Sequence, residues 1–458
     1  MHEDRPTRIG SEAMKLHNSS DEYRAVPPVA IAGFASEDRE RAIRRARRRL
    51  IPFLLLMYII SFLDRANIGF AKQALQTYVG ISPDAFAMAA GLFFVSYSIS
   101  GFPSNLILHK IGAKIWMAII MVTWGLVSMA TMLVTGSASL YTLRLLLGVA
   151  EAGFFPGVIL YLTYWFPNRI RGQMMGLFYL GVPLALVLGS PLSGFLLGMH
   201  PVGSLQNWQW MFLIEGFMAV IAGVAAYWYL DNKPEDATWL PAAEKRALAE
   251  TLAREEDERR SSGPSSVLRM LRNPRVLYFL LIYTVIQISV YGAVFYLPTE
   301  VSTLLGKPAG LEVGLVSAIP WICASAAVYW LPRMADTFNR HRSFAALIML
   351  VAGCASFVFP AAGPRVGLIA LSVAVSGIIA VQPIFWTFPT GYLADRAAAG
   401  GIAVVTLGNL GGFMGPKLKV WAEEHFRSQS AGLYLLAALT VVNAGIIALA
   451  KVRRRSYS

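Results

Sequence analysis

The chain has 458 residues, of which 56% are hydrophobic and 15% are charged, and its formal net charge is +13. Soluble domains contain about 45–50% apolar and about 25% charged residues, so this composition excludes an ordinary globular protein and indicates a polytopic membrane protein. Lys and Arg lie in short clusters between apolar runs. This distribution is typical of the loops of a membrane protein and not of a continuous nucleic-acid-binding face.

Residues 1–49 are predicted to form a cytoplasmic N-terminal arm. They lack the apolar stretch of a cleavable signal peptide, and they end in a basic run from Arg41 to Arg49. Basic residues next to an apolar segment are typical of the cytoplasmic side of a membrane.

Twelve apolar runs follow, each long enough to be a membrane-spanning helix, which needs about 20 residues. The first six runs cover 50–71, 86–108, 113–134, 138–161, 172–198 and 208–230. The second six runs cover 275–298, 311–332, 341–361, 366–390, 397–421 and 428–451. The predicted fold is therefore an all-α membrane protein of two six-helix bundles, 50–230 and 275–451.

A long polar insert, 231–274, separates the two sets of runs. It contains a charged stretch at 254–260 and a Ser/Gly/Pro stretch at 261–266. This pattern predicts a solvent-exposed amphipathic helix followed by a flexible link. The short loops on the side of the arm carry most of the Lys and Arg residues. We therefore expect a multi-pass inner-membrane protein with the insert, both termini and the tail 452–458 in the cytoplasm.

A weak internal repeat relates the two halves. The loops 109–114 and 333–342 lie between the second and third helix of each half, and each is followed further on by an aromatic residue and then an Arg, at 164–169 and 391–396. Repeats in corresponding positions of two six-helix halves are typical of secondary transporters.

Four ionisable residues inside the predicted spans are candidates for function: Asp64, Arg65, Arg144 and Glu151. A charge at the centre of a spanning helix costs roughly 2.5–3.5 kcal/mol on the insertion scale, so such residues are usually retained for a purpose. Two acids and two bases together suggest a paired network that faces a wet interior cavity.

The two residue types predict different roles. An arginine guanidinium stays charged and has a planar fork that matches a carboxylate, so Arg65 is our candidate for binding an anionic substrate. Burial raises the pKa of a carboxyl group, whereas a neighbouring arginine lowers it. Asp64 and Glu151 are therefore candidate proton carriers. Tyr58 shares a helical face with Arg65, and Arg144 shares one with Glu151, because each pair is seven residues apart.

Further polar and aromatic residues within the spans could complete a binding cavity, although interhelical packing or hydrogen bonding is the alternative reading of each. They are Tyr97, Tyr179, Gln287, Tyr291, Gln382, Trp386 and Asn409. The sequence has no phosphate-binding loop and no zinc or esterase motif. Cys323 and Cys354 lie in apolar stretches without metal-ligand spacing, and we expect them to be packed core thiols. We therefore predict no enzyme activity, no cofactor and no metal site.

Several motifs resemble the major facilitator superfamily, and within it the anion:cation symporter family, over residues 45–455. They are Asp64-Arg65-Ala66-Asn67-Ile68-Gly69, the run from Arg144 to Pro156, and Gly101 to Asn105 leading to Gly112 and Lys114. The runs Trp386 to Thr390 and Gly408 to Phe413 look like the sugar-acid and tartrate permease branch, and the runs 183–194 and 291–299 look like permeases of the L-rhamnonate type.

The resemblance implies a major facilitator fold of twelve helices and alternating access. It also implies inward co-transport of a small carboxylate with protons across the lipid bilayer, here expected of a monomer. It assigns proton sites to Asp64 and Glu151 and substrate contacts to Arg65, Tyr97 and Asn409. We add Asn67 from the first motif as a substrate contact. Gly112, Lys114, Asp336 and Arg340 are the predicted gate residues. Asn105 stands where the superfamily motif usually has an acid, which weakens the expected gate of the first half.

Two rival functions remain open at this point. An aromatic-acid permease, of the phthalate or hydroxyphenylacetate type, would suit a cavity lined by Phe295, Trp321 and Trp386. An exporter of the same fold would use the same helices in the opposite direction of transport.

Overall fold

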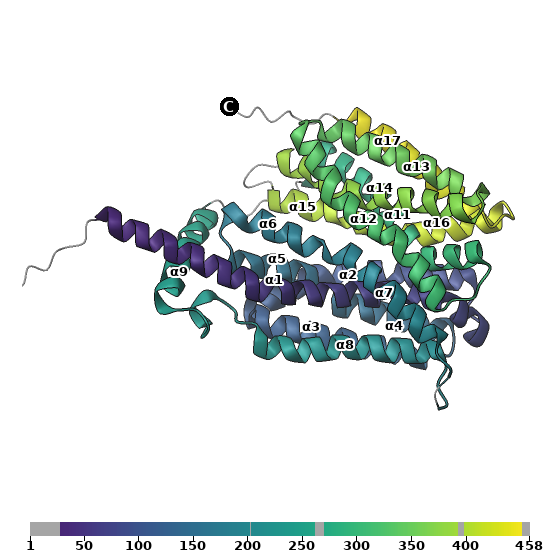
Figure 1. Cartoon of the computed structure of the whole chain (residues 1–458), viewed down its shortest axis with the longest axis horizontal. Helices are drawn as coiled ribbons and strands as arrows, with labels where there is room; N and C mark the ends of the chain where they lie inside the picture. Colours follow the sequence, from purple (N-terminus) through teal and green to yellow (C-terminus); the bar gives the residue numbers. More distant parts are fainter. Residues whose placement is uncertain (1–27, 202, 262–269, 393–397, 451–458) are drawn as a thin grey trace, which may run out of the picture.

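The computed structural model describes residues 28–201, 203–261, 270–392 and 398–450, which form helices joined by short connections, with no strand among them (Figure 1). The predicted tail 452–458, the Arg at 396 and most of the predicted link, from 262 onward, lie outside the described residues.

The first group of helices packs mainly within itself (Figure 1). Its members are α1 (Pro28–Ala74), α2 (Pro83–Ile111), α3 (Ala113–Ala130), α4 (Ser137–Glu151), α5 (Phe154–Trp165), α6 (Asn168–Tyr179), α7 (Gly181–Gly198) and α8 (Asn207–Tyr229). α3 packs along α8, α2 along α4 and α1 along α7. The predicted span 138–161 thus consists of α4 and α5, and the span 172–198 falls on α6 and α7.

The second group contains the remaining long helices. Its members are α11 (Pro274–Leu305), α12 (Leu311–Thr337), α13 (His341–Val358), α14 (Pro364–Tyr392), α15 (Ala398–Thr406), α16 (Gly411–His425) and α17 (Ala431–Leu449). α14 packs against both α12 and α13, and α13 packs along α17. The predicted span 397–421 is divided between α15, a 3-10 turn over Leu407–Leu410, and α16.

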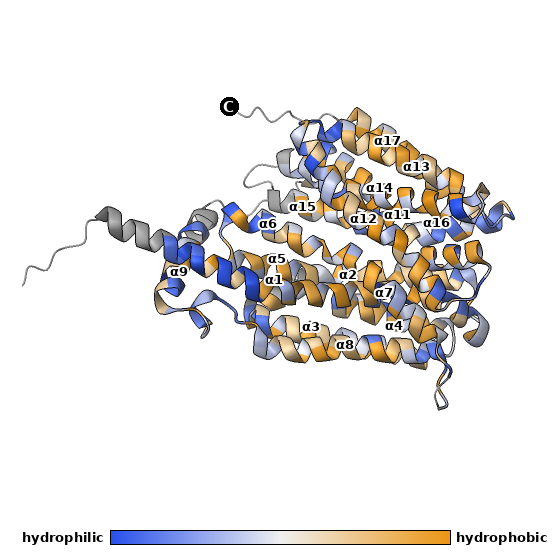
Figure 2. Ribbon diagram, in the orientation of Figure 1, coloured by the Kyte–Doolittle hydropathy of each residue, from blue (hydrophilic) through white to orange (hydrophobic). Residues whose placement is uncertain are grey.

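Length and apolar character make these helices suitable for crossing a membrane. Eleven helices in the described ranges are long and apolar enough to span one, and they correspond to every predicted span except 397–421. Figure 2 shows the hydrophobic residues along the middle of both helix groups and the hydrophilic residues toward the two ends of the molecule. This distribution is expected for a protein whose central belt contacts hydrocarbon.

Local sequence sets where two of the long helices begin. Ser82 precedes α2, and its side chain accepts a hydrogen bond from the backbone of Ala85 at 3.1 Å. Asn273 precedes α11 in the same way and accepts from the backbone of Arg275 at 3.0 Å. In both cases a proline occupies the first turn, where its missing N–H costs no hydrogen bond.

One end of the molecule, which we call the basic end, carries the start of α1 together with α9 (Ala242–Ser261) (Figure 1). α1 extends into the predicted arm as a continuous helix. It packs on α9, where Arg45 Nε lies 3.0 Å from the carboxylate of Glu244, and only 5% of Glu244 is exposed. The predicted amphipathic helix of the insert is therefore held against the basic run of the arm.

The opposite end, which we call the sealed end, is where the two groups of helices meet closely. α7 packs along α12, and α2 packs along α16. A Cβ atom on Gly194 of α7 would lie 2.6 Å from the carbonyl oxygen of Gly310, so glycine is needed for this approach. Asp84 at the start of α2 forms an ion pair with Lys417 of α16. Small residues and one ion pair thus close the sealed end.

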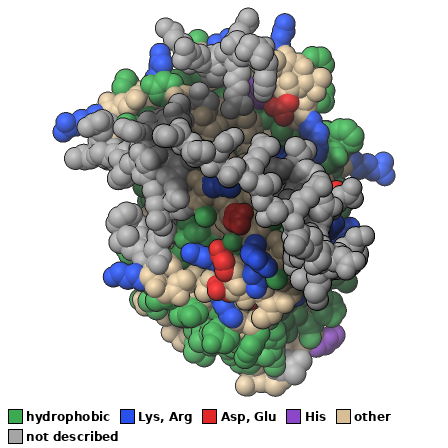
Figure 3. All heavy atoms as spheres, turned by 90° about the vertical axis from the view of Figure 1, so that its left-hand side faces the viewer, with side chains coloured by type: hydrophobic (Ala, Val, Ile, Leu, Met, Phe, Trp, Pro, Cys, Tyr) green, Lys and Arg blue, Asp and Glu red, His purple; other side chains and the backbone are tan. Residues whose placement is uncertain are grey.

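The basic end differs from the sealed end in the contacts between the two groups. The side-chain hydrogen bonds, ion pairs and ring contacts seen between the two groups lie on one side of the molecule, from the level of Arg65 and Tyr291 to the sealed end. Figure 3 shows the basic end face on, with Lys and Arg side chains gathered on it and a hollow near its centre. As far as the described residues go, the space between the groups is therefore open toward the basic end.

The structure corrects the expectation for the two cysteines. Cys323 of α12 and Cys354 of α13 are exposed on the protein surface instead of packed in the core. Both lie on helices whose apolar residues partly face outward, so an apolar stretch in this chain does not by itself indicate burial within the protein.

The close approach of α7 and α12 generates the first prediction. Gly194→Leu should separate the two helices and destabilise the protein by about 1–3 kcal/mol, as overpacking usually does. A cysteine placed at the buried Ser190 should then react faster with a water-soluble thiol reagent. Gly445→Leu is the matched control, because nothing lies within 4 Å of a Cβ at that position. Equal labelling rates in the two variants would contradict a seal at α7 and α12.

Candidate functional site

A buried ion pair between α1 and α4 lies at the centre of the molecule. Arg65 Nη2 lies 2.6 Å from Glu151 Oε2, and Arg65 Nε donates to the same oxygen at 3.2 Å. The other carboxylate oxygen accepts a hydrogen bond from Ser61 at 2.8 Å. Arg65 is 8% exposed and Glu151 is 3% exposed, so water can stabilise neither charge. Both charges therefore depend on these partners for their stability.

Glycine residues and a helix break bring Glu151 to this position. Glu151 is the last residue of α4, and α5 begins at Phe154. A Cβ on Gly148 would collide with the backbone of Phe93, so glycine there lets α4 approach α2 closely. Ser61 and Arg65 are four residues apart on α1 and therefore lie on one face of that helix, opposite α4.

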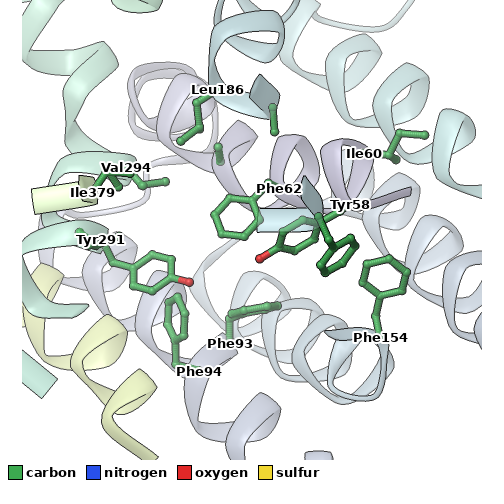
Figure 4. Close-up of a cluster of buried hydrophobic side chains, with 14 of the residues drawn as sticks. Tyr58, Ile60, Phe62, Phe93, Phe94, Phe154, Leu186, Tyr291, Val294 and Ile379 are labelled. Atoms are coloured by element: carbon green, nitrogen blue, oxygen red, sulfur yellow. The ribbon is translucent and has the colours of Figure 1, made fainter. Parts of the chain in front are cut away.

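Aromatic rings surround the guanidinium of Arg65. Its Cζ atom lies 4.9 Å from the ring centre of Phe62, 5.0 Å from that of Phe93 and 5.2 Å from that of Tyr97. Such contacts stabilise a partly desolvated cation. Arg65 Nη1 also donates to the hydroxyl of Tyr291 at 3.3 Å. Tyr291 belongs to α11, and in Figure 4 its hydroxyl points toward the rings of Phe62 and Phe93. The pair therefore lies between the two groups of helices.

Asp64 takes part in a second polar cluster, behind the first. Its Oδ1 accepts a hydrogen bond from Ser128 of α3 and another from Asn67 Nδ2 at 3.0 Å. Asn67 is only 1% exposed, so the structure places this predicted substrate residue with Asp64 and not beside Arg65. Arg144 is buried near Asp64 and Glu151, which both attract its charge. None of the described residues forms a hydrogen bond or ion pair with it.

A third cluster belongs to the second group of helices. Gln287 Nε2 of α11 donates to Asn409 Oδ1 at 2.7 Å, and Tyr283 donates to the same oxygen at 3.4 Å. The ring of Trp386 on α14 packs edge-on against Tyr283, with 5.0 Å between ring centres. The structure thus brings Gln287, Asn409 and Trp386 together, as a group separate from Arg65 and Glu151.

Two predicted tyrosines lie to one side of the ion pair. Tyr58 is buried and stacks on Phe178 at 4.2 Å between ring centres, within the aromatic cluster of Figure 4. Tyr179 is 36% exposed and contacts Phe155 edge-on at 5.5 Å. Of the two, only Tyr179 has the exposure that a direct contact with a ligand in an open cavity requires.

The predicted gate residues lie at the basic end, each within its own half. Gly112 has φ +87°, and the backbone N–H of Lys114 donates to Asn232 Oδ1 at 3.0 Å. Asp336 lies 2.7 Å from the His341 ring, and this exposed contact lies next to Arg340. In the described part of the chain these residues form no contact between the two groups, which agrees with the open basic end.

Sequence analysis missed several polar residues of these clusters. Ser61 and Ser128, which donate to Glu151 and Asp64, carry no charge and give no signal within an apolar run. Glu215 lies inside the predicted span 208–230 and is fully buried, so a search for acids in every span would have found it. Lys419, 4% exposed in α16, lies within the predicted span 397–421, so a search for basic residues in every span would have found it.

The ion pair generates the second prediction. Glu151→Ala leaves Arg65 without its counter-ion in a buried position, which should destabilise the protein by about 3–5 kcal/mol in thermal unfolding. Glu312→Ala is the matched control, because its partner Lys307 is exposed, and it should cost about 0–1 kcal/mol. Equal losses in the two variants would contradict the importance of the buried pair.

Comparisons with known proteins agree with this architecture. The chain is 46% identical to the inner membrane transport protein RhmT of Escherichia coli strain K12 over 91% of this chain and 96% of that protein. It is 41% identical to a putative tartrate transporter of Agrobacterium vitis over 90% of this chain and 92% of that protein.

The fold also matches a solved structure of the xylose transporter XylE from Escherichia coli in an inward open conformation. The TM-score is 0.71 at 13% identity, over 89% of this chain and 97% of that one. A profile of the Major Facilitator Superfamily matches residues 54–416. The chain is therefore a multi-pass membrane transporter that belongs to the major facilitator superfamily.

Proposed function

We propose that this transporter is a proton-coupled symporter that imports a small organic anion, a sugar acid of the L-rhamnonate type or a hydroxycarboxylate such as tartrate. The observation that carries this proposal is the Arg65–Glu151 pair, which is buried between the two helix groups and contacts Tyr291 of the second group. The names of the relatives support the substrate class.

Exchange of partners at Arg65 explains coupling. The carboxylate of a substrate competes with Glu151 for the same guanidinium, since both match its planar fork. A proton on Glu151 removes the negative charge of this competitor and releases Arg65 to the substrate. Substrate and proton therefore bind together more favourably than either does alone, which is the thermodynamic requirement for symport.

The second group of helices offers partners for the rest of the substrate. Gln287 and Asn409 present amide groups, and Gln287 Oε1 has no hydrogen-bond partner among the described residues. Amides both donate and accept, so they suit the hydroxyl groups of a sugar acid. Because Arg65 and these amides belong to different halves, a bound substrate would draw the halves together, as alternating access requires.

The open basic end gives the orientation. We infer that it faces the cytoplasm of a bacterial cell with an inner membrane, because the basic run of α1 and the basic loops lie there. The structure then corresponds to the inward-facing state, closed at the periplasmic side by the sealed end. The boundaries proposed for the two bundles, 50–230 and 275–451, place Arg65 and Tyr291 in different bundles.

A second candidate is transport of an aromatic acid. The rings of Phe62, Phe93 and Tyr97 around Arg65 favour it, because they could stack on an aromatic substrate whose carboxylate binds the guanidinium. Competition decides between the two: excess unlabelled phthalate should leave uptake of labelled L-rhamnonate or tartrate unchanged if the substrate is a sugar acid or hydroxycarboxylate.

Proteoliposomes with an imposed pH gradient test the proposed coupling. Labelled sugar acid should accumulate on the alkaline side, and a protonophore should abolish this accumulation. Glu151→Gln should stop accumulation but allow exchange of labelled for unlabelled substrate, because Gln cannot release a proton. Glu312→Gln, an exposed carboxylate in a different part of the protein, should behave as the wild type. Uptake that ignores the pH gradient would contradict proton coupling.

Substrate binding at Arg65 gives a separate prediction. Arg65→Lys keeps the charge but loses the fork, so affinity for the carboxylate should fall about 30-fold or more, the equivalent of about 2 kcal/mol. The measurement is displacement of labelled substrate from the purified protein. Unchanged affinity would show that the substrate carboxylate binds elsewhere.

A further inference from the structure

Glu215 is a buried acid that the proposed exchange at Arg65 does not use. It lies in the middle of α8 and its exposure is 0%. No Lys, Arg or His in the described ranges forms an ion pair with it. An ionised carboxylate in such a place is costly unless it is paired or fully hydrogen-bonded.

The hydrogen bonds around Glu215 leave it short of donors. Ser193 of α7 donates to Oε1 at 2.7 Å, whereas Oε2 has no partner among the described residues. Asp64 Oδ2 and Asn67 Oδ1, nearby, are also buried without a partner. When both carboxyl groups are ionised, all three unpartnered atoms are oxygens that can only accept hydrogen bonds. Buried polar atoms are nearly always hydrogen-bonded, so these oxygens need a donor. A proton on one of the carboxyl groups would supply it.

Asn67 connects Glu215 to Asp64. Its amide nitrogen donates to Asp64 at 3.0 Å, and its side chain also interacts with the Glu215 carboxyl group. The close approach of α3 and α8 holds the clusters together, since a Cβ on Gly216 would lie 2.7 Å from the carbonyl oxygen of Gly125. Glu215 and Asp64 therefore both lie next to Asn67, whose amide nitrogen donates to Asp64.

The helices that pack against α8 supply no other charge near Glu215. α7 contains no ionisable residue, and Lys114 is the single one in α3, at its first turn near the basic end. α1 contributes Asp64, while its Arg65 is paired with Glu151. Arg144 of α4 is buried near Asp64. Asp64 is thus the acid that acts on Glu215. Two neighbouring buried carboxyl groups with unpartnered oxygens favour a state in which one of them is protonated.

We propose that Glu215 and Asp64, which both lie next to Asn67, form a coupled carboxyl pair that holds a proton in the interior of the first helix group, in addition to the proton that Glu151 takes up. The proposal rests on the proton-coupled function given above, and adds Glu215 as a proton-binding residue. A proton that leaves one carboxyl group makes that group negative, and this charge favours protonation of the other. The two acids therefore titrate as a unit.

Glu215→Gln tests the pair, because Gln has the same shape and cannot ionise. Without the second negative charge, Asp64 should take up its proton at lower pH, so the pH profile of uptake should move by roughly one pH unit to the acid side. Exchange of labelled for unlabelled substrate should persist. Glu215→Asp restores a carboxyl group and should return the profile toward that of the wild type, which a purely structural role of Glu215 would not produce.

Infrared spectroscopy of the protein in nanodiscs, without substrate, is the second measurement. The wild type should show a protonated-carboxyl band at neutral pH that weakens in Glu215→Gln and persists in the control Glu312→Gln. An unchanged band, or an unchanged pH profile in Glu215→Gln, would overturn the pair. Wild-type uptake that ignores a pH gradient while the band is present would overturn proton coupling itself, so the two failures are distinguishable.

Discussion

The structure depends on one buried ion pair, Arg65 with Glu151. In the low-dielectric interior neither charge is stable alone, and the pair needs its further hydrogen bonds to offset the loss of water. Ser61 supplies one of these bonds, and Tyr291 supplies another from the opposite helix group. The site therefore consists of parts from both groups, and a change in the charge of Glu151 alters the interaction between them.

The positions of small residues determine where the two groups of helices pack closely. They lie at the sealed end, and the basic end is open. Gly69, Gly194 and Gly314 allow backbone of one group to touch backbone of the other on the side beyond Arg65. In the described residues no comparable contact occurs toward the basic end. The ion pair thus lies at the inner limit of the open space. An anion that enters from the basic end would there meet the buried positive charge of Arg65, which contacts residues of both groups.

Much of this arrangement could be predicted from the sequence. Apolar runs predicted twelve spanning helices, of which eleven are confirmed, and the charges of Asp64, Arg65 and Glu151 marked buried positions. The hydrogen-bond and ion-pair partners of these charges could not be predicted. Helical periodicity indicates on which side of its helix a residue lies, but not which other helix packs against that side. The division of 397–421 depends on the local break between Leu407 and Leu410, near several glycines that an apolar run does not reveal. Glu215 was missed although its span was correctly predicted.

Consecutive residues on α1 explain how one helix can serve two chemistries. Asp64 and Arg65 are adjacent, so their side chains point about 100° apart around the helix. Arg65 faces α4 and the space between the groups, whereas Asp64 faces α3 and the interior of the first group. A proton on Asp64 is thereby kept away from the substrate carboxylate, yet any rotation or shift of α1 moves both residues together. Covalent adjacency, and not direct contact, then links the interior carboxyl pair to the anion-binding arginine.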